Sequence, residues 1–164
     1  MVDFLFSGYG GHRGLHRVGR RQRQMGIRDR AYGVRPLVLG RLGDTHILAS
    51  ETCAFDIIGA EFVRDIAPGE MVVLTASSVQ SLRPFQQKSG RFCVFEYIYF
   101  ARPDSIVEGQ SVYDARKAIG SELARESHVD ADVVVPVPDS GVPAAVGFAE
   151  ASGLPLELGT IPNP

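Results

Sequence analysis

The stretch that decides the fold is VVVPVPDSGVPAAVGFAEASG, from Val133 to Gly153. Its first five residues form a short, almost wholly apolar run, which is typical of a buried parallel strand. A Pro-Asp-Ser-Gly turn follows, and the small apolar residues after it favour a helix that ends at Gly153. Strand, turn and helix in this order predict the opening of an α/β domain with a parallel sheet.

The turn between this strand and helix is a candidate ligand site, formed by Asp139, Ser140 and Gly141. Ligands of α/β sheets bind at the carboxyl ends of the strands, and the amides of a helix N-terminus can hold a phosphate. The simpler interpretation is that Asp139 or Ser140 only caps the helix. The turn matches neither the phosphate loop of nucleotide hydrolases nor the dinucleotide fingerprint, so spacing alone leaves both interpretations open.

Upstream of this unit, FCVFEYIYF from Phe92 to Phe100 predicts a strand that is covered on both faces, because aromatic and β-branched residues dominate it. Glu96 is its only charged residue, and we expect it to pair with Arg102. A helix is predicted after Ser111, which can cap it. Its apolar residues recur at helical spacing: Val112, Ala115, Ile119 and Leu123.

The first half of the chain has the pattern of an antiparallel sheet. PLVLG and HILAS, separated by a glycine-containing turn, predict a hairpin. A short helix over CAFDIIGA should end at Gly59, and FVRDI and MVVLT then resume the extended pattern. The polar segment from Ala76 to Arg91 is predicted to be a linker near a domain boundary.

The amino-acid composition argues against nucleic acid and membranes as binding partners. The 164 residues include 17 basic and 19 acidic side chains, which give a formal net charge of -2. Such a balance supplies no field that attracts nucleic acid or an anionic membrane, and no apolar run has the length of a membrane helix. Two cysteines, Cys53 and Cys93, indicate no disulfide framework, which favours the cytoplasm as the compartment.

Several segments together resemble a known family, the amidophosphoribosyltransferases of purine synthesis. In the second half the resemblance is carried by CVFEYIYFARPDS (93–105), SVYDARKAIGSELA (111–124) and DADVVVPVPDSGVPAAVGFAEASGLPLELG (130–159). In the first half it is carried by RDRAYGVRPLVLG (28–40) and ASETCAFDIIGAEFVRDIAPGE (49–70). These segments follow one another in the family's order.

The resemblance implies a mixed α/β chain made of two partial domains. Residues 27–77 would be the C-terminal part of an N-terminal-nucleophile glutaminase sheet. Residues 78–164 would be a linker and the N-terminal part of a phosphoribosyltransferase domain with a parallel α/β sheet. Residues 1–26 do not fit the family, and we interpret them as an aberrant leader, with a frameshifted stretch of the same gene as the working hypothesis.

The implied reaction converts glutamine, phosphoribosyl pyrophosphate and water to 5-phosphoribosylamine, glutamate and pyrophosphate. The family's glutaminase nucleophile is an N-terminal cysteine, whereas this chain begins Met1-Val2, so no catalytic residue is predicted and the isolated chain is expected to be inactive. The alternative is a non-catalytic, phosphate-binding or regulatory protein. An amidotransferase that makes glucosamine phosphate is disfavoured by VVVPVPDSG.

The resemblance also assigns roles to single residues. Asp139, Ser140 and Gly141 would bind the phosphates of the substrate, with Ser140 as a ligand of Mg2+. Cys93 matches a cysteine that ligates a [4Fe-4S] cluster in some members of the family, while its other three ligands would come from sequence that this chain does not contain. Members of the family are expected to be homo-oligomers.

Overall fold

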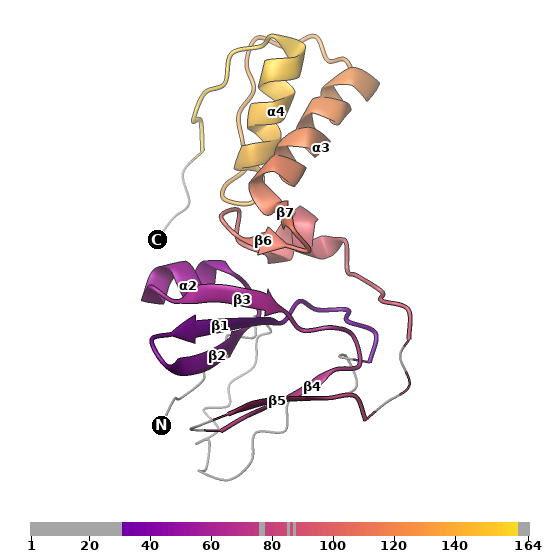
Figure 1. Cartoon of the computed structure of the whole chain (residues 1–164). Helices are drawn as coiled ribbons and strands as arrows, with labels where there is room; N and C mark the ends of the chain where they lie inside the picture. Colours follow the sequence, from indigo (N-terminus) through magenta and orange to yellow (C-terminus); the bar gives the residue numbers. More distant parts are fainter. Residues whose placement is uncertain (1–30, 76–77, 85, 87, 161–164) are drawn as a thin grey trace, which may run out of the picture. The chain divides into compact units, whose positions relative to one another are not determined.

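The computed structural model describes residues 31–75, 78–84, 86 and 88–160, and residues 1–30 lie outside the described part of the chain (Figure 1). The described residues divide into two compact units. The first unit contains the residues up to Ser50 together with Ala60–Phe92, and the second contains Glu51–Gly59 together with the residues from Cys93 onward. The sequence-based boundary between residues 77 and 78 stays a prediction.

An antiparallel sheet forms the centre of the first unit. Its strands are β1 (Val38–Leu42), β2 (Thr45–Ala49) and β3 (Glu61–Asp65), in the order β2-β1-β3. The predicted hairpin is confirmed as β1 and β2, and Gly43 in its turn has a φ of 57°, which a residue without a Cβ adopts at little cost. Leu37, Leu39 and Ile66 form the buried core beside this sheet.

A second antiparallel pair joins β4 (Met71–Leu74) to β5 (Val79–Leu82). The strand β4 was predicted, but β5 lies inside the segment that we expected to be a linker, so that expectation is wrong for residues 79–82. Thr75 and Ser78 explain the error, because their hydroxyls bond each other at 2.7 Å and the Thr75 amide donates to the Ser78 carbonyl at 2.9 Å. This polar turn reverses the direction of the chain, so that the largely polar strand β5 pairs with the apolar strand β4.

Glu70 connects the two strand systems of the first unit through a buried carboxylate. Its side-chain oxygens accept hydrogen bonds from Arg64 at 2.6 and 3.0 Å, from Ser81 Oγ at 2.7 Å and from the Ala67 amide at 2.9 Å. These contacts lower the pKa of Glu70 to about 2, with the Arg64 hydrogen bonds as the largest cause, although burial opposes the shift. The carboxylate is therefore ionised at neutral pH and fully bonded.

The second unit contains three helices, a π-helical turn and a small hairpin. Helix α2 (Cys53–Ile58) ends at Gly59 as predicted, where φ is 70°. The π-helical turn η1 (Glu96–Phe100) precedes β6 (Ile106–Val107) and β7 (Gln110–Ser111), and α3 (Val112–Glu126) and α4 (Val142–Ser152) follow. The predicted cap of α3 is confirmed, because Ser111 Oγ accepts from the Asp114 amide at 3.2 Å.

The predicted buried strand over residues 92–100 is wrong. The backbone coils there into η1, with hydrogen bonds from the Ile98 amide to the Val94 carbonyl and from the Ala101 amide to the Glu96 carbonyl. The coil brings the carbonyls of Tyr97 and Ala101 close enough for the guanidinium of Arg116 to bind both, at 2.5 and 2.7 Å, whereas an extended strand would separate these residues by about 13 Å. Phe95, Tyr99 and Phe100, which we expected to be buried, are 54%, 64% and 48% exposed.

The expected pairing of Glu96 with Arg102 is also wrong. Glu96 is 1% exposed, whereas Arg102 lies at the surface and forms a bidentate ion pair with Asp104 at 2.8 and 3.1 Å. Because Arg102 follows the end of η1 and Asp104 is two positions away, the local pair forms without bringing the guanidinium to the buried carboxylate.

The strand predicted over residues 133–137 forms only in part. Val134 makes an isolated parallel bridge with Leu156, through its amide to the Pro155 carbonyl and its carbonyl to the Glu157 amide. The parallel direction is therefore as expected, but Pro136 has no amide to continue a ladder. Val133, Val135 and Val137 are exposed rather than buried in the described part of the chain.

Helices α3 and α4 pack directly against each other (Figure 1). Two glycines allow the close approach: a Cβ at Gly120 would lie 1.8 Å from the Ala144 carbonyl oxygen, and one at Gly147 would lie 1.9 Å from the Lys117 carbonyl oxygen. Ser121 Oγ donates to the Gly147 carbonyl at 3.0 Å, and Lys117 pairs with Glu150 at 2.8 Å. The mixed α/β character of the fold is confirmed, and none of the described helices is long and apolar enough to cross a membrane.

Candidate functional site

The predicted ligand turn lies at the N-terminus of α4. Gly141 is the N-cap residue, and no side chain caps the helix, so the interpretation of Asp139 or Ser140 as a simple helix cap is wrong. The turn is closed by the backbone, because the Val142 amide donates to the Asp139 carbonyl at 3.3 Å. The side chains of Asp139 and Ser140 are therefore not used by the helix.

Gly141 is required for the tight geometry of this turn. A Cβ at this position would lie 2.6 Å from the Val137 carbonyl oxygen, closer than real Cβ contacts come. The Pro138–Asp139 peptide bond is cis. A residue without a Cβ is therefore needed at this position for the backbone to adopt the turn.

Residues beyond α4 brace the segment that enters the turn. Thr160 Oγ1 donates to the Pro136 carbonyl at 3.2 Å, and Pro136 is fully buried. Together with the bridge between Val134 and Leu156, this contact holds the segment that leads into Asp139 and Ser140. The three predicted site residues thus come together on a braced loop at a helix N-terminus, with Asp139 exposed and Ser140 half-buried.

The chemistry of this turn suits an anionic ligand and a hard cation. A helix N-terminus favours negative charge, and hydroxyl and carboxylate oxygens are the ligands that Mg2+ prefers. The Ser140 hydroxyl has no hydrogen-bond partner among the described residues, so it can bind a metal without breaking an existing bond. No group of three potential His, Cys, Asp or Glu ligands occurs among those residues, so Mg2+ here would also need oxygens from the substrate or from water.

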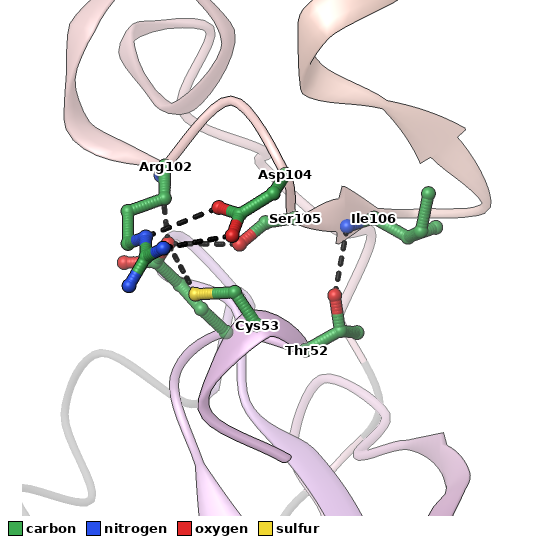
Figure 2. A network of polar contacts seen from close by, with 7 residues as sticks. Thr52, Cys53, Arg102, Asp104, Ser105 and Ile106 are labelled. Atoms are coloured by element: carbon green, nitrogen blue, oxygen red, sulfur yellow. Dashed lines mark hydrogen bonds and ion pairs between the residues drawn. The ribbon is translucent and has the colours of Figure 1, made fainter. Parts of the chain in front are cut away.

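A second polar cluster, which we call the Glu51 cluster, consists of seven residues (Figure 2): Glu51, Thr52, Cys53, Arg102, Asp104, Ser105 and Ile106. Glu51 Oε2 accepts from the Arg102 amide at 2.8 Å, from Ser105 Oγ at 3.0 Å and from Cys53 Sγ at 3.7 Å. Thr52 Oγ1 accepts from the Ile106 amide at 2.8 Å. The cluster lies entirely within the second unit.

The electrostatics of this cluster make Cys53 a structural residue. Burial raises the pKa of the Cys53 thiol, and the nearby carboxylates of Glu51 and Asp104 raise it further, although a hydrogen bond with Ser105 opposes them. A thiol with a raised pKa is a poor nucleophile at neutral pH. Cys53 is 4% exposed, so it is a packed residue of α2.

Curated proteins with similar sequences share one description. The chain is 53% identical over 136 residues to the amidophosphoribosyltransferase of Rhizobium etli, with 80% of the chain and 27% of the relative covered. It is 51% identical over 150 residues to that of Synechococcus elongatus, with 89% and 30% covered. A solved structure of glutamine phosphoribosylpyrophosphate amidotransferase from Bacillus subtilis superimposes with a TM-score of 0.74 at 51% identity, over 79% of this chain and 28% of that one.

The chain belongs to the amidophosphoribosyltransferase family. It spans under a third of the length of the relatives it matches. No family model matches the sequence. The agreement with the Bacillus subtilis structure confirms the fold class that the resemblance implied.

The iron–sulfur assignment is not supported by the residues of this amidophosphoribosyltransferase segment. Cys93 is half-buried and free, and Cys53 is the only other cysteine in the sequence. A [4Fe-4S] cluster uses four protein ligands, normally thiolates. The two cysteines of this sequence do not meet that requirement.

Sequence reasoning missed the Glu51 cluster. Its two halves are separated by 54 positions, as between Glu51 and Ser105 or Thr52 and Ile106, and no spacing rule connects residues so far apart. The available signal was local: a Glu-Thr pair directly before a helix, with a side-chain oxygen on each residue. The sequence analysis predicted the helix that follows this pair but gave the pair itself no role.

Proposed function

We propose that this chain forms part of an amidophosphoribosyltransferase of de novo purine synthesis. The parent reaction converts glutamine, phosphoribosyl pyrophosphate and water to 5-phosphoribosylamine, glutamate and pyrophosphate. The observation that carries this proposal is about 50% identity to amidophosphoribosyltransferases across 80–89% of the chain. Cytoplasmic location and homo-oligomeric assembly belong to the same proposal.

In this proposal the turn at Asp139, Ser140 and Gly141 binds the phosphates of phosphoribosyl pyrophosphate. The N-terminus of α4 carries the positive end of the helix dipole, which favours a bound phosphate. Gly141 permits the crowded backbone conformation of the loop. The Ser140 hydroxyl would hold Mg2+, which neutralises phosphate charge when bound. Asp139 is exposed beside it and could bind the metal through water.

A chimeric enzyme tests the function. Residues 31–160 would replace the matching segment of the Bacillus subtilis relative, and formation of 5-phosphoribosylamine would be measured with either glutamine or ammonia as the nitrogen source. We expect activity with both. Binding of pyrophosphate by the 164-residue chain, combined with an inactive but folded chimera, would favour the non-catalytic alternative instead.

The role of Ser140 is tested in the same chimera. Ser140→Ala should raise the Mg2+ concentration needed for half-maximal activity, because one hard oxygen ligand is lost. Ser127→Ala is the matched control, since Ser127 is exposed just after α3 and should leave the Mg2+ requirement unchanged. Equal Mg2+ requirements in wild type and Ser140→Ala would contradict the metal assignment.

A further inference from the structure

The chain enters the candidate turn through residues 135–138, which we call the entry segment. Pro136 and Pro138 have no backbone amide, so neither can extend a ladder of hydrogen bonds beyond the bridge at Val134. Pro136 is fully buried, and a buried carbonyl needs a donor. The donor that the structure shows for it is a side chain, because Thr160 Oγ1 donates to the Pro136 carbonyl at 3.2 Å.

The entry segment affects the geometry of the turn directly. Pro136 is followed by Val137, and a Cβ at Gly141 would lie 2.6 Å from the Val137 carbonyl oxygen, so the two ends of the turn are in close contact. The exit of the turn is fixed by α4, which begins directly after Gly141. A displacement of Pro136 would therefore move Val137 against Gly141 and change the position of the Ser140 hydroxyl between them.

The segment after α4 places Thr160 beside the entry segment. The parallel bridge between Val134 and Leu156 aligns the two segments. Three residues beyond Leu156, a Cβ at Gly159 would lie 2.9 Å from Val135 Cγ1, so a residue without a Cβ lets the backbone pass close to the Val135 side chain. Thr160 follows at once, and its side chain is itself exposed. A substitution of Thr160 can therefore remove the hydroxyl without leaving a cavity.

We propose that Thr160 is a positioning residue that holds the turn 139–141 in the conformation that binds the phosphates of the substrate. The inference rests on the proposed function of that turn. In this role Thr160 does not contact the substrate, and acts only through the Pro136 carbonyl. Because the role requires a donor hydroxyl, serine can replace threonine. Valine has the same shape as threonine but no donor, so it cannot.

The test uses the chimeric enzyme with Thr160→Val, Thr160→Ser and the control Ser152→Ala, and ammonia as the nitrogen source. Ser152 ends α4 and donates its hydroxyl to the Ala149 carbonyl at 3.4 Å, so the control removes the same kind of bond at the far end of the helix. We expect Thr160→Val to raise two constants about fivefold, as loss of one neutral hydrogen bond would. These are the KM for phosphoribosyl pyrophosphate and the inhibition constant of added pyrophosphate. Thr160→Ser and Ser152→Ala should leave both unchanged.

Two further readouts separate positioning from general damage to the fold. The KM for ammonia and kcat should change less than twofold in Thr160→Val, because only the phosphate turn is affected. In the 164-residue chain, exchange of the Val142 amide, which closes the turn by donating to the Asp139 carbonyl, should be about fivefold faster in Thr160→Val than in Thr160→Ser.

The outcomes distinguish this inference from the proposed function. Unchanged phosphate constants in Thr160→Val, a fall in kcat alone, or equal exchange of the Val142 amide in the two Thr160 variants would overturn the positioning role. Each of these results would leave the proposed function intact. A wild-type chimera that forms no 5-phosphoribosylamine with either nitrogen source would instead overturn the proposed function, and this inference with it.

Discussion

At the scale of single residues, the Glu70 carboxylate shows how burial and pairing act together. Arg64, Ser81 and the Ala67 amide together donate four hydrogen bonds to it and hold its pKa at about 2, below the ordinary value of 4.5. Because the folded-state pKa is lowered, the ionised pair stabilises the first unit above about pH 4.5. This contribution is lost as the pH falls from about 4.5 to about 2.

We therefore predict that protection of β4 and β5 against hydrogen exchange, corrected for the intrinsic rate, falls as the pH is lowered from 5 to 2. Glu70→Gln should destabilise these strands by about 2 kcal/mol at pH 7, since a buried charged hydrogen-bond network loses its ionised acceptor. It should also remove most of the pH dependence. Glu61→Gln serves as the control, because that pair is exposed; an acid transition that persists in Glu70→Gln would assign the effect to another group.

A second prediction concerns Arg116. Arg116→Met should keep most of the packed stem but remove the donors to the Tyr97 and Ala101 carbonyls, which destabilises η1 by about 2 kcal/mol. Arg116→Lys should recover part of this loss, because one ammonium can reach fewer acceptors than the guanidinium fork. Hydrogen exchange of the Ala101 amide reports the change, and equal protection in all three proteins would contradict it.

Single residues also show where sequence reasoning stops. The turn that contains Ser140 and Gly141 could be placed before α4 because strand, turn and helix follow one another within about twenty residues, while its role as a site stays a prediction. The ion pair of Glu96 with Arg102 was inferred from the same kind of proximity and was wrong, because Asp104 is a nearer partner for Arg102. Glu51 could not be found at all, since its partners lie more than fifty positions away.

At the scale of elements, the α3–α4 pair depends on two glycines, Gly120 and Gly147. Ala is the better helix former by about 1 kcal/mol, so propensity alone would favour replacing them. The backbone of the partner helix occupies the space of each missing Cβ, at 1.8 Å for Gly120 and 1.9 Å for Gly147. At both positions the close contact between the two helices therefore contributes more to stability than the better helix propensity of Ala would.

We predict that Gly147→Ala destabilises the α3–α4 pair by about 2–3 kcal/mol, despite its better helix propensity. Ala118→Gly is the matched control: Ala118 is exposed on α3, and its replacement should cost only about 1 kcal/mol. Hydrogen exchange of peptides from α3 and α4 measures both. A stabilised Gly147→Ala protein would show that the helices can separate slightly at no cost.

The elements also explain which parts of the fold could be predicted. Hairpin β1–β2, helix α2 and helices α3 and α4 have local signals in their turns, caps and periodicity, and all were found. The segment 92–100 was misread because aromatic and β-branched residues favour strands only when a neighbouring strand is available. Its conformation is decided instead by Arg116, which comes from an element sixteen or more positions later.

At the scale of the whole molecule, many large apolar side chains are exposed in the described part of the chain. Val137 is 76% exposed and Leu158 73%, and Tyr99 and Ile57 exceed 60%. Extensive apolar exposure of this kind favours association. We predict that the isolated chain binds a hydrophobic dye and forms larger species as its concentration rises from about 1 to 100 µM, which light scattering would detect. A monodisperse monomer without dye binding would contradict this.

The insertion of Glu51–Gly59 into the second unit also bears on synthesis. A ribosome adds about 5–20 residues per second, so the sheet strands β1 to β5 emerge before the partners of Glu51 and Thr52 have been made. The connection between β2 and β3 must wait for residues 102–106 before its hydrogen bonds can close. The connection after β2 therefore completes its hydrogen bonding only after residue 106 has been made, although the hairpin of β1 and β2 has all its own residues long before then.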